Sequence, residues 1–223
     1  MAYIISTGKG PVQPVNADLV TEWQIENGRI YLVCDGVNHN DKTMAAVQCF
    51  AKSLINSDWI NIDSPDIKVR DNILKVLESM LSEHNGQSFC CCIAIIFEKE
   101  TILAHCGDCR IGDLTKEGVR WLTKDDVPAL NLYNKGHITK EIYAKARHFI
   151  STKLKVGANN HNSLTIKKVA TLNVERLILC SDGFWSETES LLQTNLSNIL
   201  NSVPTEIRRL EAESEDNFSV VIV

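Results

Sequence analysis

The sequence predicts an α+β fold in which antiparallel sheets are covered by helices. Five short runs of apolar or β-branched residues, each bounded by Gly, Asp, Asn or charged residues, are typical of strands. Other segments place apolar residues at every third or fourth position, which is typical of a helix with one buried face. Strands and helices come in blocks without strict alternation, so a doubly wound parallel sheet is disfavoured.

The expected strands are bounded by turns and loops that are rich in polar residues. In chain order they are residues 29–34, 88–97, 101–106, 176–180 and 218–223. Glu98, Lys99 and Glu100 separate the second strand from the third, and this short charged stretch predicts a hairpin turn.

Four helices are expected between these strands. The first lies between Asp41 and Ser57, with an apolar face made of Met44, Val47, Ala51 and Leu54. The second lies between Asp66 and His84, with Ile67, Ile73, Leu77 and Leu81 on one side. Two later helices are expected at residues 187–200 and 205–213, the last one starting after Pro204.

The chain length and the absence of any linker favour a single domain. A chain of 223 residues is long enough to bury one sizeable core, and it contains no internal repeat or low-complexity segment. We therefore expect one domain over residues 1–223. Residues 124–162 are polar, mixed in charge and the least regular part, so we expect them to form a surface flap.

The composition narrows the class of protein. The 23 Lys and Arg residues against 28 Asp and Glu give a net charge of −5 with no basic tract, which argues against a nucleic-acid binder. No apolar stretch approaches the ~20 residues of a membrane helix, and the start lacks the pattern of a secretory signal. Among the eight cysteines, residues 90–92 lie in one apolar run, as expected for buried thiols in a reducing compartment. A cytoplasmic protein without membrane association is therefore expected.

Aspartates recur where the expected strands begin or end. Two strands end directly on Asp followed by Gly, at residues 35–36 and 182–183, and three further acids are Asp18, Asp108 and Asp216. Asp and Gly are also common in ordinary turns, so a turn role is an alternative. Carboxylates gathered at one sheet edge would repel each other unless a cation neutralised them, and oxygen ligands suit Mg²⁺ or Mn²⁺. The adjacent glycine would let a backbone carbonyl approach such a ligand closely.

Six stretches in a fixed order make the pattern specific. They are "GPVQPVNAD", "VCDGV", "GQSFCCCIA", "HCGDCRIG", "LCSDGFW" and "EDNFSVVIV". Together they resemble the motifs of the metal-dependent serine/threonine protein phosphatases of type 2C, the PPM family, in a compact form like that of bacterial members. Order, spacing and strand context agree from residue 10 to the last residue, so the resemblance covers nearly the whole chain.

The resemblance implies a fold and a set of site residues. The fold is an antiparallel β-sandwich flanked by helices on both faces, with two Mn²⁺ or Mg²⁺ ions at one edge. Asp35 matches the carboxylate that bridges both ions, and the carbonyl of Gly36 matches a ligand of the second. Asp182 and Asp216 match the remaining ligands of the first ion.

Two further acids match outer positions of the same centre. Asp18 matches an acid that binds metal-bound water. Asp108, together with the Asp182 position, matches a pair that can hold a third ion in bacterial members. The implied activity is hydrolysis of phosphoserine and phosphothreonine in proteins by a hydroxide that bridges two ions, with no side-chain nucleophile. The implied partners are phosphoprotein substrates and a serine/threonine kinase.

The sequence departs from the family pattern at the phosphate-binding position. Gln13 stands where the family has an arginine, and glutamine offers neither a charge nor a bidentate fork. A nearby cation such as Lys9 could compensate. Ala17 replaces the first acid of the family's N-E-D, and Asn38 and His39 replace a glycine pair.

Three alternatives remain open at this point. The loss of the arginine leaves a pseudophosphatase, a scaffold that recognises phosphoproteins, as the second function. A redox protein built on the C-x-x-C of Cys106 and Cys109 is disfavoured, because no second pair or thioredoxin-like context accompanies it. His39 is a candidate general acid, although a lone histidine is more often a surface polar residue. We expect Arg110 to support the acidic loop and not to contact phosphate.

Overall fold

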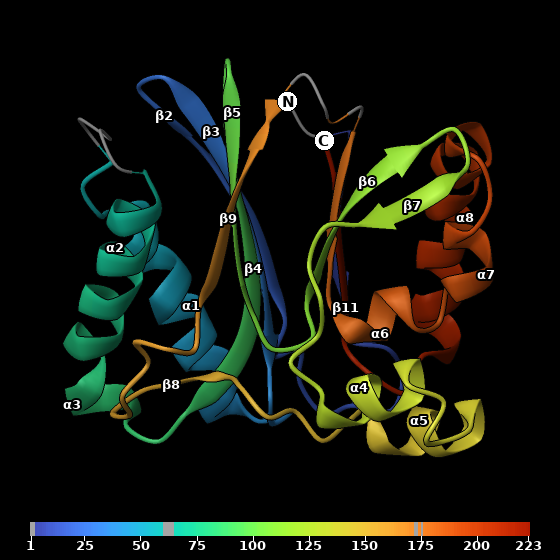
Figure 1. Cartoon of the computed structure of the whole chain (residues 1–223). Coiled ribbons are helices and arrows are strands. Elements are labelled where there is room, and N and C mark those ends of the chain that lie inside the picture. The colour runs from blue at the N-terminus through green and yellow to red at the C-terminus, as the bar shows by residue number, and fades with distance from the viewer. Residues whose placement is uncertain (1–2, 60–64, 172–173, 175) are drawn as a thin grey trace.

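The computed structural model describes residues 3–59, 65–171, 174 and 176–223. Two antiparallel sheets face each other, and helices cover both outer faces (Figure 1). The predicted α+β class with antiparallel sheets is therefore confirmed. That residues 1–223 form a single domain stays a prediction.

The first sheet joins the two ends of the chain. Its strands, in spatial order, are β1 (Ile4–Gly8), β11 (Phe218–Ile222), β10 (Leu177–Cys180), β6 (Arg110–Thr115) and β7 (Gly118–Trp121). The second sheet has the order β2 (Leu19–Ile25), β3 (Gly28–Gly36), β4 (Ser88–Phe97), β5 (Glu100–Cys106) and β9 (Thr165–Ala170). The short β8 (Leu154–Lys155) pairs with the start of β4.

Each sheet has its own helical cover. Over the second sheet lie α1 (Asp41–Ile55), α2 (Pro65–Ser79) and α3 (Leu81–His84). Over the first sheet lie α6 (Asp182–Trp185), α7 (Glu189–Leu192) and α8 (Leu196–Glu213). The flap carries α4 (Pro128–Asn134) and α5 (Lys140–Ala146), which lie at the lower end of the sandwich in Figure 1. The flap is thus more regular than its sequence predicted.

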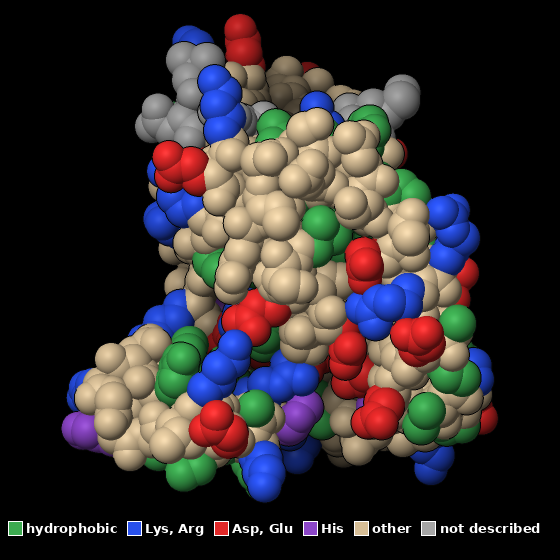
Figure 2. Space-filling model, turned by 90° about the vertical axis from the view of Figure 1, so that its right-hand side faces the viewer, with side chains coloured by type: hydrophobic (Ala, Val, Ile, Leu, Met, Phe, Trp, Pro, Cys, Tyr) green, Lys and Arg blue, Asp and Glu red, His purple; other side chains and the backbone are tan. Residues whose placement is uncertain are grey.

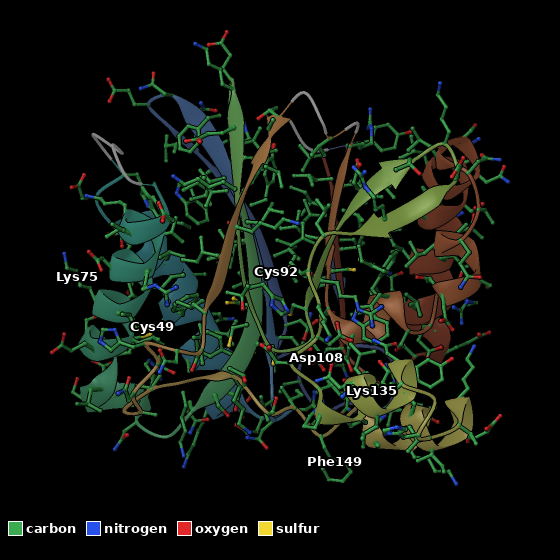
Figure 3. The ribbon with its side chains drawn as sticks, viewed as in Figure 1. Cys49, Lys75, Cys92, Asp108, Lys135 and Phe149 are labelled. Atoms are coloured by element: carbon green, nitrogen blue, oxygen red, sulfur yellow. The ribbon has the colours of Figure 1, made fainter. Side chains whose placement is uncertain are left out.

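Three hydrophobic layers hold the four structural layers together. One lies between α1, α2 and the second sheet, and one lies between α8 and the first sheet. The third lies between the sheets and contains Tyr31, Val33, Leu179 and Cys92, the last labelled in Figure 3. Strands β3 and β4 are buried on both faces, which explains their continuous apolar sequences.

The five expected strands are confirmed as β3, β4, β5, β10 and β11, each within two residues of its predicted ends. The hairpin between β4 and β5 is also confirmed, with Glu100 already in the second strand. Among the residues that the structure describes, six further strands were not predicted: β1, β2, β6, β7, β8 and β9. Strand β9 shows why, because its sequence TIKKVA is largely exposed at a sheet edge and carries no apolar run.

The helix predictions need three corrections. Residues 196–213 form one helix with Pro204 inside it, where we expected a new helix to start. Ile199, Val203 and Leu210 are all buried, so packing along the whole helix outweighs the backbone bond that proline removes. The expected helix at 187–200 is instead the short α7 and the first turn of α8.

The third correction concerns the expected helix at residues 66–84. It is divided into α2 and α3, which begins at Leu81. Ile73 and Leu77 are buried as expected, but Ile67 and Leu81 are 57% and 45% exposed. The apolar face is therefore shorter than the periodicity indicated. Among the described residues, no helix is long and apolar enough to cross a membrane.

Charges of both signs are mixed on the face formed by the later helices. Figure 2 shows acidic and basic side chains interspersed over this face. Arg209 lies within ion-pair distance of Glu206 and Glu213 on α8, and Lys140 of the flap pairs with Glu189 of α7 at 3.4 Å. This face therefore presents no field of a single sign.

Candidate functional site

Strand register brings the first two aspartates together. In the β2–β3 pair Leu19 lies opposite Cys34, so Asp18 and Asp35 come next to each other at the end of the second sheet. A Cβ added to Gly36 would lie 2.7 Å from Ala17 Cβ and 2.8 Å from Ala17 O and Thr43 Cγ2. Glycine is required there because any side chain would push the Ala17–Asp18 segment away from Asp35.

A tight turn brings Asp108 to the same place. Asp35 pairs in register with Cys90, and the open side of Gly107 is filled by the Cys90 side chain. Gly107 adopts φ +93°, a conformation that favours glycine. Trp185 Nε1 donates to Asp108 O at 2.9 Å and fixes the turn from the side of α6. Figure 3 shows Asp108 at the lower end of the sandwich, near the flap.

The first sheet contributes the other two aspartates. Ser181 N donates to Ser219 O at 3.1 Å, and Ser219 N donates to Ser181 Oγ at 2.9 Å. These bonds join the end of β10 to the start of β11, so Asp182 and Asp216 leave their strands beside each other. Asp182 begins α6 and is buried, whereas Asp216 is half-buried and accepts from Asn217 N at 2.8 Å.

The charges of the five acids act on one another. Burial, together with the charges of Asp182 and Asp216, raises the pKa of Asp18 to about 8. The pKa of Asp108 is also raised to about 8 by burial and by Asp182. Burial, Asp18 and Asp182 raise the pKa of Asp35 well above its usual range.

The pKa of Asp182 is shifted in the same direction. Burial is the largest cause of this rise and the charge of Asp216 is the second. Like charges confined in this way favour protonation at neutral pH unless a cation neutralises them. We refer to the five acids, residues 18, 35, 108, 182 and 216, as the aspartate cluster.

Unpaired oxygens test whether the cluster suits a cation. Both carboxylate oxygens of Asp18 and Oδ1 of Asp108 are buried without a hydrogen bond of good geometry, although the hydroxyls of Ser181 and Ser219 lie near Asp18 and act to lower its pKa. Buried acceptors of this kind are costly unless a donor or a cation meets them. Within the described ranges no three His, Cys, Asp or Glu side chains form a ready-made cage for one ion. Ions such as Mg²⁺ keep several waters and need one or two protein carboxylates each, so the cluster fits them.

Two further residues lie near the cluster. From the sequence we assigned no role to Asn217 and named His39 as a candidate general acid. Asn217 accepts from Ala17 N at 2.8 Å and donates to Lys9 O and Val15 O, so it joins the N-terminal segment to β11. His39 lies 3.1 Å from Asn217 Oδ1 through Nδ1 and 3.3 Å from Asp216 Oδ1 through Nε2. The D-N dipeptide before the last strand marks this position in the sequence, but we assigned a role to its aspartate only.

Gln13 lies at the rim of the cluster and its amide is already engaged. Gln13 Nε2 donates to Glu215 O at 2.7 Å, next to Asp216. Lys9 Nζ, the cation expected to compensate for the missing arginine, donates to Gln13 O at 2.6 Å. The Gln13 side chain thus holds the N-terminal loop to the last turn before β11, whereas Lys9 bonds within the N-terminal loop itself.

Arg110 is engaged by Asp125 and by the ring of Trp185. Its Nε and Nη2 donate to the two carboxylate oxygens of Asp125 at 2.7 and 2.6 Å. Its guanidinium lies 3.4 Å from the ring centroid of Trp185. Cys106 and Cys109 are buried free thiols whose pKa values are raised by burial, which makes thiolate chemistry unfavourable there.

The comparisons with known proteins bear on this architecture. Neither a family model nor a curated protein matches the chain. Among solved structures, the serine/threonine phosphatase Stp1 from Staphylococcus aureus superposes with a TM-score of 0.79 at 20% identity, covering 100% of this chain and 94% of that chain. The Mycobacterium tuberculosis phosphatase PstP/Ppp gives 0.74 at 19% identity, covering 98% and 96%.

A third structure, the PPM Ser-Thr phosphatase MsPP from Mycobacterium smegmatis in complex with cacodylate, gives a TM-score of 0.69 at 21% identity, covering 98% and 96%. This chain has the PPM phosphatase fold. The resemblance drawn from six short motifs, and the sandwich flanked by helices that it implied, are therefore confirmed.

Proposed function

We propose that this chain is a metal-dependent protein phosphatase that hydrolyses phosphoserine and phosphothreonine. The observation that carries the proposal is the aspartate cluster, whose buried oxygens lack hydrogen bonds of good geometry at the edge where both sheets of a PPM fold meet. A structure of PstP is in complex with two manganese ions, which supports the same cofactor for this chain. A phosphorylated protein would be the substrate, and a serine/threonine kinase the counterpart that supplies it.

Each residue of the cluster would have its own role in holding the metal ions. Asp35 would hold both Mn²⁺ or Mg²⁺ ions, the carbonyl of Gly36 would hold the second, and Asp182 and Asp216 would complete the first site. Asp18 would hold water at the buried side, and Asp108 would hold a weaker third ion. When bound, the ions supply an activated water as nucleophile and neutralise the phosphate. The strands that end on these acids keep the carboxylates rigidly oriented, as a preorganised site requires.

The direct test is hydrolysis of a phosphothreonine peptide with Mn²⁺, with Mg²⁺ and with EDTA. We expect turnover with either metal and loss of turnover on chelation. Turnover that is unaffected by EDTA would contradict the metal mechanism. Absence of turnover with both metals, together with retained binding of the phosphopeptide, would favour the scaffold function that the loss of arginine at position 13 suggests.

Replacement of Asp108 should separate the outer ion from the inner pair. Asp108→Ala removes a buried carboxylate that borders the cluster through Asp182. We expect a reduced turnover number but retention of most of the metal-induced rise in melting temperature, because Asp35, Asp182 and Asp216 remain. Calorimetric titration with Mn²⁺ checks this, and loss of the tight sites in this variant would show that Asp108 belongs to the inner pair.

Replacement of Gln13 by arginine should improve phosphopeptide hydrolysis. Gln13 already lies beside the Asp216 turn, so Gln13→Arg would place a charged fork at the rim of the cluster. A charge-assisted bond contributes roughly 1.5–3 kcal/mol, and we expect a gain of about tenfold in kcat/KM, mainly through KM.

The matching control for this gain is Gln13→Ala, which removes one bond between an exposed amide and a carbonyl. We expect it to have little effect on steady-state kinetics. Unchanged kinetics for Gln13→Arg with strong impairment for Gln13→Ala would show that glutamine has a role of its own.

A further inference from the structure

A histidine of the β3–α1 loop faces a carboxylate of the aspartate cluster. His39 Nε2 lies 3.3 Å from Asp216 Oδ1, and the two side chains are 28% and 35% exposed, so an ion from solvent can reach the gap. The histidine belongs to this chain and not to the type 2C pattern, because Asn38 and His39 stand where that pattern has a glycine pair. What can lie between the two atoms depends on which ring nitrogen of His39 carries the hydrogen.

The side chain of Asn217 decides this question. Its Nδ2 donates to Lys9 O and Val15 O at 3.1 Å, and a carbonyl can only accept. Its Oδ1 accepts from Ala17 N at 2.8 Å and lies 3.1 Å from His39 Nδ1. Because an amide oxygen has no hydrogen to give, Nδ1 is the donor in this contact, and Nε2 of the neutral ring is an acceptor. Histidines that ligate a metal typically hold their other ring N–H on an oxygen in this way.

The loop that carries His39 is short and is held at both ends. Directly after β3, Val37 N donates to Ser88 O at 3.2 Å. At the other end Asn40 caps α1, where its side chain accepts from Thr43 N at 3.0 Å. Strand β3 and helix α1 therefore fix the position of the imidazole relative to the aspartate that ends β3.

Two acceptors at this distance need a cation that binds both. Nε2 of His39 and Oδ1 of Asp216 each present a lone pair, so they repel unless a proton or a metal ion joins them. Burial first, and the charge of Asp216 among others, raise the pKa values of Asp18, Asp35 and Asp182, so Asp216 is part of the cluster that suits a divalent ion. A nitrogen and an oxygen that each lie about 2.0–2.2 Å from one ion are roughly 3.0–3.4 Å apart, as these two atoms are.

We propose that His39 Nε2 is a ligand of the metal ion held by Asp216, and that this nitrogen makes the site prefer Mn²⁺ to Mg²⁺. Mg²⁺ takes oxygen ligands, whereas imidazole suits transition metals. Asp35, Asp182 and water would complete the coordination. An imidazole that ligates the ion cannot also serve as a general acid, so this role replaces the one that the sequence suggested for His39. The assignment rests on the metal centre of the proposed function, and it adds a ligand and a metal preference.

Two measurements on four proteins test this assignment. The proteins are the wild type, His39→Ala, His148→Ala and His161→Ala. His148 is the rival source of nitrogen because its charge acts on Asp182, and the exposed His161 is the control. The first measurement is pulsed EPR with less than one equivalent of Mn²⁺, which detects a coordinated nitrogen through ¹⁴N modulation of the spin echo. The second is calorimetric titration with Mn²⁺ and with Mg²⁺. Circular dichroism melting in EDTA establishes that each variant is folded.

We expect ¹⁴N modulation in the wild type, because a site with three carboxylates and an imidazole should fill before the second site. The modulation should disappear in His39→Ala and persist in His148→Ala and His161→Ala. Loss of an outer-shell partner alone typically weakens metal binding about 10–100-fold, so His39→Ala should weaken Mn²⁺ binding by at least about tenfold. Its Mg²⁺ affinity should stay nearly unchanged.

Three outcomes would overturn the assignment. The first is a wild type that binds Mn²⁺ without ¹⁴N modulation. The second is modulation that persists in His39→Ala. The third is equal weakening of Mn²⁺ and Mg²⁺ binding by His39→Ala, which would indicate a change in the loop and not the loss of a nitrogen ligand.

Phosphopeptide hydrolysis by the same proteins separates this assignment from the proposed function. Metal-dependent hydrolysis by a wild type that lacks ¹⁴N modulation would leave the phosphatase and remove the histidine ligand. Nitrogen ligation through His39 without any hydrolysis would do the reverse. A wild type that binds no Mn²⁺ at all would contradict both.

Discussion

Asp182→Asn should abolish phosphopeptide turnover, with a loss of about a thousandfold or more, while the metal-free protein stays at least as stable as the wild type. The loss follows because Asp182 would ligate an ion that supplies the nucleophile. The stability follows because burial and Asp216 already disfavour the charged form of Asp182. An isosteric amide removes that repulsion without leaving a cavity.

Melting temperatures with EDTA and with Mn²⁺ separate the two effects. The rise produced by Mn²⁺ should shrink in Asp182→Asn, because stabilisation by a ligand follows RT ln(1 + [L]/Kd). Asp35→Asn should give the same pair of results. Asp71→Asn, at an exposed position of α2, is the control and should change neither turnover nor the metal response. Wild-type rates for Asp182→Asn would show that the ligand assignment is wrong.

The second large effect is on the pH dependence of stability without metal. The pKa values of Asp18 and Asp108 are raised from 3.8 to about 8, so the folded protein holds more protons than the unfolded chain between these limits. Stability therefore falls as pH rises from about 4 to about 8, by about 1.4 kcal/mol per pH unit for each extra bound proton. Below pH 4 both states are protonated and this contribution is fully present.

Urea unfolding in EDTA at a series of pH values measures this slope. Asp18→Asn should flatten it, because the amide cannot release a proton. Mn²⁺ should reverse the trend, since the ions bind the deprotonated acids and are excluded by protonation. Stability that rises steadily from pH 4 to pH 8 in EDTA would contradict the raised pKa values and, with them, the confinement of the acids.

The sequence was sufficient for the parts of the fold where burial leaves a strong pattern. Strands β3 and β4 are apolar on both faces, and the acids at the end of β3 and after β10 stand out against such runs. Edge strands such as β9 carry exposed polar residues and give no comparable signal. Pro204 misled the helix prediction because local chemistry marks a break, whereas long-range packing of Ile199 and Leu210 preserves the helix.

In the candidate site, too, residues marked by a local sequence pattern could be predicted and residues placed by long-range contacts could not. The aspartates could be predicted because each follows or precedes a strand that fixes its position. Asn217 could not, because its bonds to Ala17 N, Lys9 O and Val15 O depend on how the N-terminal segment folds back against β11. Nothing local to this residue distinguishes it from an asparagine in an ordinary turn. Contacts between segments far apart in the sequence decide these roles.

The most direct measurement of the central claim is anomalous diffraction at the manganese absorption edge from crystals grown with MnCl₂. We expect two peaks at the edge of the sandwich, bridged by Asp35, with Asp182 and Asp216 beside the first and the carbonyl of Gly36 beside the second. A third, weaker peak near Asp108 would fit the same arrangement. Full occupancy elsewhere on the protein, with no peak within coordination distance of Asp35, would contradict it.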